Sequence, residues 1–147
     1  MSVVRGKRTE NELQVIRCLR DLAIHTIVCC CNESVFPKSK RWLYTQRLTN
    51  EAVDALLCAV RANSVKVPDD DDGTIYRYRQ LQQVQANAHL EGLEVLLSLA
   101  YELVKIEGRR VDYWAGLIVD ARKKLQGWIN SDRKRYKKSN TTTKYRG

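Results

Sequence analysis

The chain has 147 residues, of which 26 are Lys or Arg and 17 are Asp or Glu, so its formal net charge is +9. This length is enough for one domain with a single core, and the positive charge favours an anionic partner or environment. No apolar run approaches the ~18–20 residues of a membrane span and residues 1–7 lack a signal-peptide core, so we expect a cytoplasmic protein with no membrane partner.

The first predicted helix covers residues 9–32, after a flexible basic N-terminus at residues 1–8. Thr9 and Glu12 have the spacing of a capping box, in which the Thr side chain caps the helix and the Glu reaches back. Apolar residues then recur at steps of three and four, which predicts one buried face: Leu13, Ile16, Leu19, Ala23, Ile27 and Cys30.

A basic, aromatic corner, Val35–Leu48, separates the first two helices. Pro37 cannot continue a helix from its N-terminal side, and it biases Phe36 towards an extended conformation. A second helix is therefore predicted over residues 40–63, with Ser39 as its cap. Its apolar face consists of Leu48, Ala52, Val53, Leu56 and Val60.

The third predicted helix, residues 74–107, follows four consecutive carboxylates that favour its positive N-terminal end, with Asp72 or Thr74 as the cap. Gly108 is the predicted C-cap. The core positions are Leu90, Leu93, Leu97, Ala100 and Val104. Val95, Leu96, Leu99 and Leu103 add a second apolar side, which is typical of a helix that contacts more than its own bundle.

The fourth predicted helix, residues 111–136, has the most regular apolar repeat of the chain. Its core positions are Val111, Trp114, Ile118, Ala121, Leu125 and Trp128. Residues 139–147 are basic and polar and are expected to form a flexible tail. Four amphipathic helices joined by short turns predict an all-α, up-down-up-down four-helix bundle spanning residues 9–138.

Most active-site and metal-site patterns fail on spacing. The Asp70–Gly73 segment lacks the Glu that a calcium loop needs at its twelfth position, which falls on Arg79. His25 and Cys29 lie one helical turn apart, but no second pair completes a zinc site. We therefore predict no metal, no cofactor and no catalytic residues. Five cysteines, three of them adjacent at residues 29–31, suit a reducing compartment better than a disulfide framework.

One enzymatic alternative remains. Arg20 and His25 are similar to the Arg-x4-6-His motif of HEPN ribonucleases, which are also helical bundles. That resemblance implies joint action of the two side chains on an RNA phosphodiester. The pattern is short, and it lies in the first helix rather than late in the chain as is usual in that family.

The basic residues point to nucleic acid. Residues 109–138 carry ten cations and three acids, with Tyr136 interleaved as stacking groups often are in nucleic-acid binders. The predicted contacts are Lys38, Lys40, Arg41, Arg47, Arg109, Arg110, Arg122, Lys123, Lys124, Arg133, Lys134, Arg135, Lys137 and Lys138. A solvated, merely solubilising surface is the alternative for these charges.

The chain resembles the accessory variability determinant (Avd) of diversity-generating retroelements and the related bundle proteins encoded in ribosomal-RNA intervening sequences. The resemblance rests on Phe36-Pro37-Lys38-x-x-Arg41 leading into Leu43-x-x-Gln46-x-Leu48, on Leu90–Leu97, and on Leu125-x-x-Trp128. Residues 59–64 keep only part of the Pro-Ala-Asn-Ile-Ala-Glu-Gly-like segment of the intervening-sequence proteins, which favours Avd.

This resemblance implies a homopentameric, basic barrel that binds a dedicated reverse transcriptase and its template RNA, or DNA, and supports mutagenic copying without catalysing it. A basic polymerase facing a basic subunit needs a negatively charged contact or an RNA bridge. Asp69, Asp70, Asp71 and Asp72 are the concentrated acidic group in the sequence, and they are the predicted contact with the polymerase.

Overall fold

A computed structural model of the chain describes residues 3–146, and the side-chain surroundings of residues 12–136. Over that range the chain forms four α-helices and no strand: α1 (Val3–Cys31), α2 (Lys38–Ser64), α3 (Thr74–Val104) and α4 (Gly108–Arg146). The predicted all-α, four-helix architecture is confirmed. None of these helices combines the length and hydropathy that crossing a membrane requires.

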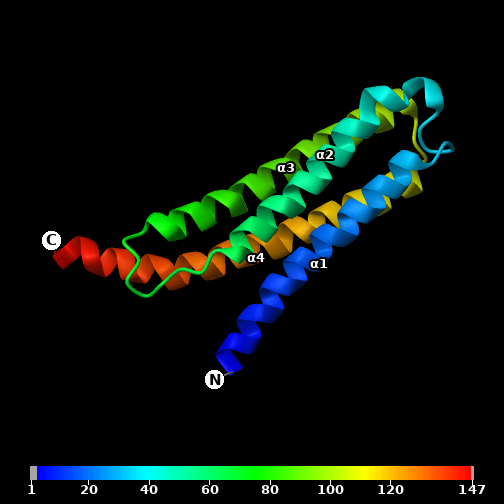
Figure 1. The fold of residues 1–147 in the computed structure, drawn as a ribbon. Coiled ribbons are helices and arrows are strands. Elements are labelled where there is room, and N and C mark those ends of the chain that lie inside the picture. The colour runs from blue at the N-terminus through cyan, green and yellow to red at the C-terminus, as the bar shows by residue number, and fades with distance from the viewer. Residues whose placement is uncertain (1–2, 147) are drawn as a thin grey trace.

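Successive helices run in alternating directions (Figure 1). Each one packs against two neighbours, in the pairs α1–α2, α2–α3, α3–α4 and α1–α4. The loops at 32–37 and 105–107 therefore lie at the same end of the bundle, which we call the corner end. The loop at 65–73 lies at the opposite end, which we call the acidic-loop end.

The core follows the predicted repeats of α3 and α4. On α3, Leu90, Leu93, Leu97 and Ala100 are buried. On α4 the buried series consists of Trp114, Ile118, Ala121, Leu125, Trp128 and Ile129. The corner closes this core at one end, because Val35 and Phe36 turn inward immediately before Pro37 and α2 begins at Lys38.

The predicted buried face of α1 is partly wrong. Leu13 and Ile27 are exposed. The face of α1 that packs against the core is rotated relative to the predicted one and consists of Val15, Leu19, Leu22, Thr26 and Cys29. α1 has apolar residues on both sides, so periodicity alone does not select one face. Thr26 belongs on the inner side because its hydroxyl accepts a hydrogen bond from Trp114 Nε1 at 3.0 Å.

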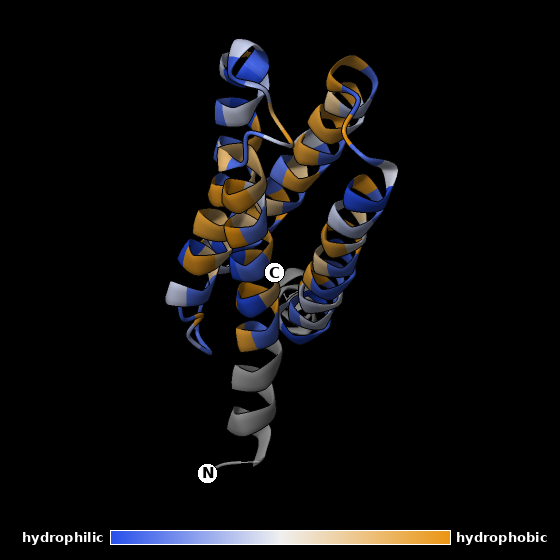
Figure 2. Ribbon diagram, turned by 90° about the vertical axis from the view of Figure 1, so that its right-hand side faces the viewer, coloured by the Kyte–Doolittle hydropathy of each residue, from blue (hydrophilic) through white to orange (hydrophobic). Residues whose placement is uncertain are grey.

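α2 meets the core mainly through small side chains. Its buried residues are Leu48, Ala52, Ala55, Cys58, Ala59 and Ala62, whereas Leu57 and Val60 are exposed. Val60 was predicted on the buried face and lies on the outer one. Small residues let the α2 and α3 backbones approach closely; Val53 and Leu56 are partly buried against this core, while Leu57 and Val60 lie on the outside. Apolar colour accordingly appears on outward-facing as well as inward-facing turns (Figure 2).

Three predicted caps are wrong. Residue 9 lies inside α1 rather than at its start, and the Glu12 carboxylate accepts a hydrogen bond from Arg79 on α3. Ser39 lies in the first turn of α2, whose N-cap is Pro37. Gly108 is the first residue of α4, while α3 is closed by Lys105 in the left-handed conformation with φ 61°.

The acidic loop does cap α3, by means of two of its four carboxylates. The N-cap residue is Gly73 rather than the predicted Asp72 or Thr74, but Asp72 Oδ1 accepts from the Thr74 amide at 3.0 Å. Asp71 accepts from the amides of Ile75 and Tyr76 at 3.2 and 3.1 Å. These bonds satisfy backbone donors that have no partner within the helix, and they place negative charge at its positive end.

The first and the last helix are longer than predicted, α1 at its N-terminal end and α4 at its C-terminal end. α1 begins at Val3 rather than residue 9, and α4 continues to Arg146 rather than ending near residue 136. Residues 129–146 contain no Pro or Gly that would stop the intrahelical hydrogen bonds. The predicted mobility of residues 1–8 and 139–147 stays a prediction.

Candidate nucleic-acid interface

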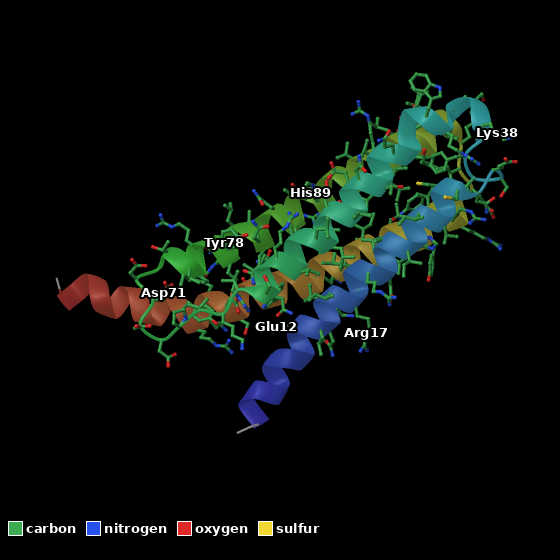
Figure 3. The ribbon with its side chains drawn as sticks, viewed as in Figure 1. Glu12, Arg17, Lys38, Asp71, Tyr78 and His89 are labelled. Atoms are coloured by element: carbon green, nitrogen blue, oxygen red, sulfur yellow. The ribbon has the colours of Figure 1, made fainter. Side chains whose placement is uncertain are left out.

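The first three turns of α2 carry an exposed basic surface, which we call the corner surface. It consists of Lys38, Ser39, Lys40, Trp42, Leu43, Gln46 and Arg47, all exposed. No acidic residue occurs in the sequence between Glu33 and Glu51, so this segment is uniformly positive. Lys38 lies 3.7 Å from Glu33 in a solvent-exposed pair, which holds the lysine only weakly. Figure 3 shows Lys38 beside the loop at the corner end.

Arg41, the fourth predicted contact in this region, is half-buried and directed toward the end of α1. Its Nη2 lies 3.5 Å from the Cys31 carbonyl oxygen at the C-terminus of α1. A guanidinium at that position complements the negative end of the α1 dipole. Arg41 therefore joins α1 to α2 and helps fix the direction in which α2 leaves the corner.

Arg109 and Arg110 lie in the first turn of α4, at the same end of the bundle as the corner surface. Arg109 is exposed, whereas Arg110 is half-buried. Arg110 faces His25 and Cys29 closely enough for its charge to influence the pKa of both groups. Only part of the charge of this pair is therefore directed to solvent.

The middle of α4 is largely neutralised by contacts within the bundle. Arg122 donates to Glu94 at 3.0 Å, to Glu91 at 3.2 Å and to Asn87 at 3.3 Å, all on α3. Lys124 lies 3.3 Å from Asp120 on its own helix. Of the three cations at residues 122–124, Lys123 is the exposed one. This part of α4 is therefore poorly suited to binding a polyanion.

A second basic group occupies α4 near the acidic-loop end. Arg133 and Lys134 are exposed, and Arg135 lies with its guanidinium 5.7 Å from the centroid of the Tyr136 ring. The side chains of Lys137 and Lys138 lie outside the described residues. Arg133 is about 36 Å along α4 from Arg109, so the predicted cations form two separate groups rather than one patch.

Sequence reasoning missed a buried polar cluster that joins all four helices. Arg79 on α3 makes two hydrogen bonds to Asp132 on α4, at 2.6 and 3.3 Å, and one to Glu12 on α1 at 2.9 Å. Its Nη1 donates to the Ala62 and Val65 carbonyls at the end of α2, at 3.4 and 3.0 Å. Gln83 Nε2 donates to Asp132 at 2.9 Å.

The signal for this cluster was present in the core repeats. Arg79 and Gln83 continue the buried series of α3 towards its N-terminus, and Asp132 continues that of α4 beyond Trp128. Opposite charges on the core positions of two antiparallel neighbours, at the same end of the bundle, are expected to meet. The cluster is enclosed by protein and is a structural element rather than a ligand site.

Arg20 and His25, the pair proposed for a ribonuclease, do not share a face. Five residues place them about 140° apart around the helix. Arg20 is exposed, whereas the His25 ring lies 5.1 and 5.8 Å from the ring centroids of Tyr113 and Trp114 on α4. Burial and the nearby Arg110 charge lower the pKa of His25, which favours a neutral ring packed between α1 and α4.

The cysteines next to His25 are free thiols with little tendency to ionise. Cys29 Sγ lies 3.4 Å from His25 Nε2, and burial raises the pKa of the Cys29 thiol. Burial also raises the pKa of Cys30 to about 11. Within the described residues, no group of three or more His, Cys, Asp or Glu side chains is arranged to hold a metal ion.

The acidic-loop carboxylates divide into two pairs. Asp71 and Asp72 are occupied as caps of α3, while Asp69 and Asp70 are exposed to solvent. Figure 3 places Asp71 at the end of the bundle opposite Lys38. The acidic loop and the corner surface are therefore separated by the length of the bundle.

Comparison of the chain with protein-family models, curated proteins and solved structures gives no match.

Proposed function

We propose that this protein is a non-catalytic, nucleic-acid-binding accessory subunit of the Avd kind, which holds template RNA for a reverse transcriptase in the cytoplasm. The observation that carries the nucleic-acid part is the corner surface, where exposed cations stand without an intervening acid. The retroelement and the polymerase partner rest on the sequence resemblance. Five free cysteines agree with action in a reducing compartment.

The distribution of paired and unpaired charge supports binding rather than catalysis. The pair proposed for phosphodiester cleavage is divided between two faces of α1, and the His25 ring is packed against α4. The exposed cations at the two ends of the bundle are suited to backbone phosphates. Such contacts are independent of sequence and weaken steeply with salt.

We further propose that the subunit assembles with itself through the outer stripe of α3, on the side opposite its core positions. This stripe consists of Leu81, Val84, Val95, Leu99 and Leu103, with exposed fractions between 45% and 60%. These exposed apolar side chains form two groups, before residue 85 and after residue 94, and such surface is unfavourable in water and favours association. The pentamer follows from the resemblance. Light scattering that finds a monomer at micromolar concentration would contradict this assembly.

The acidic loop is the proposed contact with the polymerase, and the structure sharpens its test. Asp71 and Asp72 also stabilise α3, so replacing all four residues would confuse recognition with folding. Asp69→Asn combined with Asp70→Asn removes two exposed charges and keeps both caps. Loss of polymerase co-purification in ribonuclease-treated extracts supports a direct contact, whereas unchanged co-purification rules out these two carboxylates.

The nucleic-acid part is tested by incubating the purified protein with labelled single-stranded RNA over a range of salt. We expect retention without cleavage, and log affinity falling with log salt by about 0.7 per phosphate contacted. Lys40→Gln with Arg47→Gln should lower that slope by about 1.4, while Arg122→Gln should leave it nearly unchanged because Arg122 is paired with α3. Cleavage that disappears in His25→Ala would instead support the ribonuclease.

A further inference from the structure

Trp42 is an unusually exposed tryptophan. Its exposed fraction is 75%, whereas Trp114 and Trp128, the other tryptophans of the sequence, are buried at 0% and 4%. Tryptophan is highly buried on average, because its large apolar surface is unfavourable in water. A single exposed apolar residue needs no explanation by itself, so the surroundings of Trp42 decide what it does.

Those surroundings are polar and positive. Lys38 and Gln46 lie four residues before and after Trp42, so they share its face of α2, each about 6 Å away along the helix axis. Lys40 and Arg47 are also exposed, but they lie about 160° and 140° around the helix from Trp42, at the opposite edge of the exposed surface of α2. On its own face the indole is therefore bordered by Lys38 and Gln46, and the exposed Leu43 lies between it and the two further cations.

The helix beneath Trp42 is held on its inner side. Tyr44 packs against the core, Leu48 is fully buried, and Arg41 contacts the Cys31 carbonyl at the end of α1. These contacts set the rotation of α2 about its axis. Trp42 is consequently presented outward by a fixed helix.

We propose that Trp42 stacks on an unpaired base of single-stranded RNA, while Lys38 contacts the adjacent phosphate and the strand continues across the exposed surface of α2 to Lys40 and Arg47. This inference rests on the proposed RNA binding, and it adds a preference for single strands. An exposed aromatic ring in a positive setting is the arrangement by which proteins hold single-stranded nucleic acid of any sequence. Bases within a duplex are already stacked on one another and do not offer a free face.

Two other occupants fit the surface less well. The centre of a protein–protein interface is depleted in charged residues, whereas the exposed surface of α2 that carries this indole also carries three cations and no acid. A membrane surface is bound in proportion to the apolar area buried, and here Trp42 and Leu43 supply that area alone within residues 38–47. Single-stranded RNA uses both the ring and the charges.

The test compares four proteins: the wild type, Trp42→Ala, Trp42→Phe, and Tyr78→Ala as a matched control. Tyr78 is an exposed aromatic residue beside an arginine at the acidic-loop end of the bundle. We expect Trp42→Ala to weaken binding to a single-stranded RNA about 5- to 150-fold without changing the salt slope. Trp42→Phe should retain part of the affinity, and Tyr78→Ala should bind like the wild type.

Tryptophan fluorescence gives a direct readout, because Trp42 is the exposed member of three tryptophans. Single-stranded RNA should quench the wild-type emission and leave Trp42→Phe almost unaffected, whereas duplex RNA should quench neither. Affinity for duplex RNA should be the same in all four proteins. A normal helical circular-dichroism spectrum for each variant shows that the comparison concerns binding.

The contrary results are distinct. Wild-type protein that binds neither form of RNA contradicts the proposed function itself. Wild-type protein that binds single strands with no loss in Trp42→Ala leaves that function intact and overturns the role of Trp42. The same role is overturned if Trp42→Ala changes the molar mass in solution, or abolishes binding to anionic lipid vesicles while RNA binding persists.

Discussion

The strongest consequence for stability concerns the buried pair between Arg79 and Asp132. Their side chains are 5% and 3% exposed, and they are joined by a bond of 2.6 Å. Asp132→Asn keeps the shape of the side chain but leaves the guanidinium buried with its partial partner Glu12. Removing one member of a buried ion pair costs about 3–5 kcal/mol, since the remaining charge loses its compensation.

That cost converts into a large shift of the melting temperature. The entropy of unfolding is about 2.1 cal/mol/K per residue, which is about 0.3 kcal/mol/K for a chain of this length. Each kcal/mol therefore lowers Tm by about 3 °C, and Asp132→Asn should lower it by about 10–15 °C. The measurement is thermal unfolding followed by circular dichroism at one fixed protein concentration, because assembly would make Tm concentration-dependent.

Two further variants identify the cause. Asp120→Asn removes a surface carboxylate of the same helix that pairs with Lys124, and it should change stability by less than about 0.5 kcal/mol. The double variant Arg79→Met/Asp132→Leu removes both buried charges and should recover much of the loss. An Asp132→Asn protein within about 1 kcal/mol of the wild type, or a double variant no better than the single one, would refute this reasoning.

Three smaller predictions follow from other parts of the bundle. Lys105→Gly should raise stability by about 0.5–1 kcal/mol in denaturant titration, because the left-handed residue loses its side-chain strain; a loss would contradict this. The lowered pKa of His25 means that the folded state disfavours protonation, so stability should fall as pH drops below about 6.5, and it should fall less in His25→Phe. Cys31 is exposed while Cys29 and Cys30 are buried with raised pKa values, so a thiol reagent should react fastest at Cys31, and Cys31→Ser should remove that phase.

The sequence predicts α3 and α4 better than α1 and α2, for a physical reason. Trp114–Trp128 repeat large apolar residues on one dominant face of α4, and although α3 also has an outer apolar stripe, its Leu90–Ala100 series repeats without a break, so in both helices period and burial agree. α1 and α2 carry apolar residues on two sides, and the side that is buried depends on the neighbouring helix. In α2 the alanines face the core because their small side chains let α3 approach closely. The hydrophobicity of each residue taken alone does not predict which side of α2 is buried.

The same limit applies to the basic residues. Net charge and helical spacing locate the cations along the chain, but the acids that neutralise them come from another helix. Arg122 meets Glu91 and Glu94 because α3 and α4 are antiparallel neighbours at that level. Arg41 meets the end of α1 because the corner folds back. The structure therefore reduces a uniform basic helix to separate charged ends.

This separation has a consequence for how the protein handles RNA. Under the proposed function, the corner surface and the basic group at residues 133–135 contact different parts of one RNA strand. Arg109 at the corner end and Arg133 lie about 36 Å apart along α4, so a short RNA reaches the group at one end and a longer RNA reaches both. Linked contacts raise affinity through effective concentration once the RNA between them spans the two groups.

The affinity of wild-type protein should accordingly rise with RNA length in a step, and Arg133→Gln with Lys134→Gln should remove the step while leaving short-RNA binding unchanged. A smooth increase that these substitutions do not alter would show that the second group takes no part.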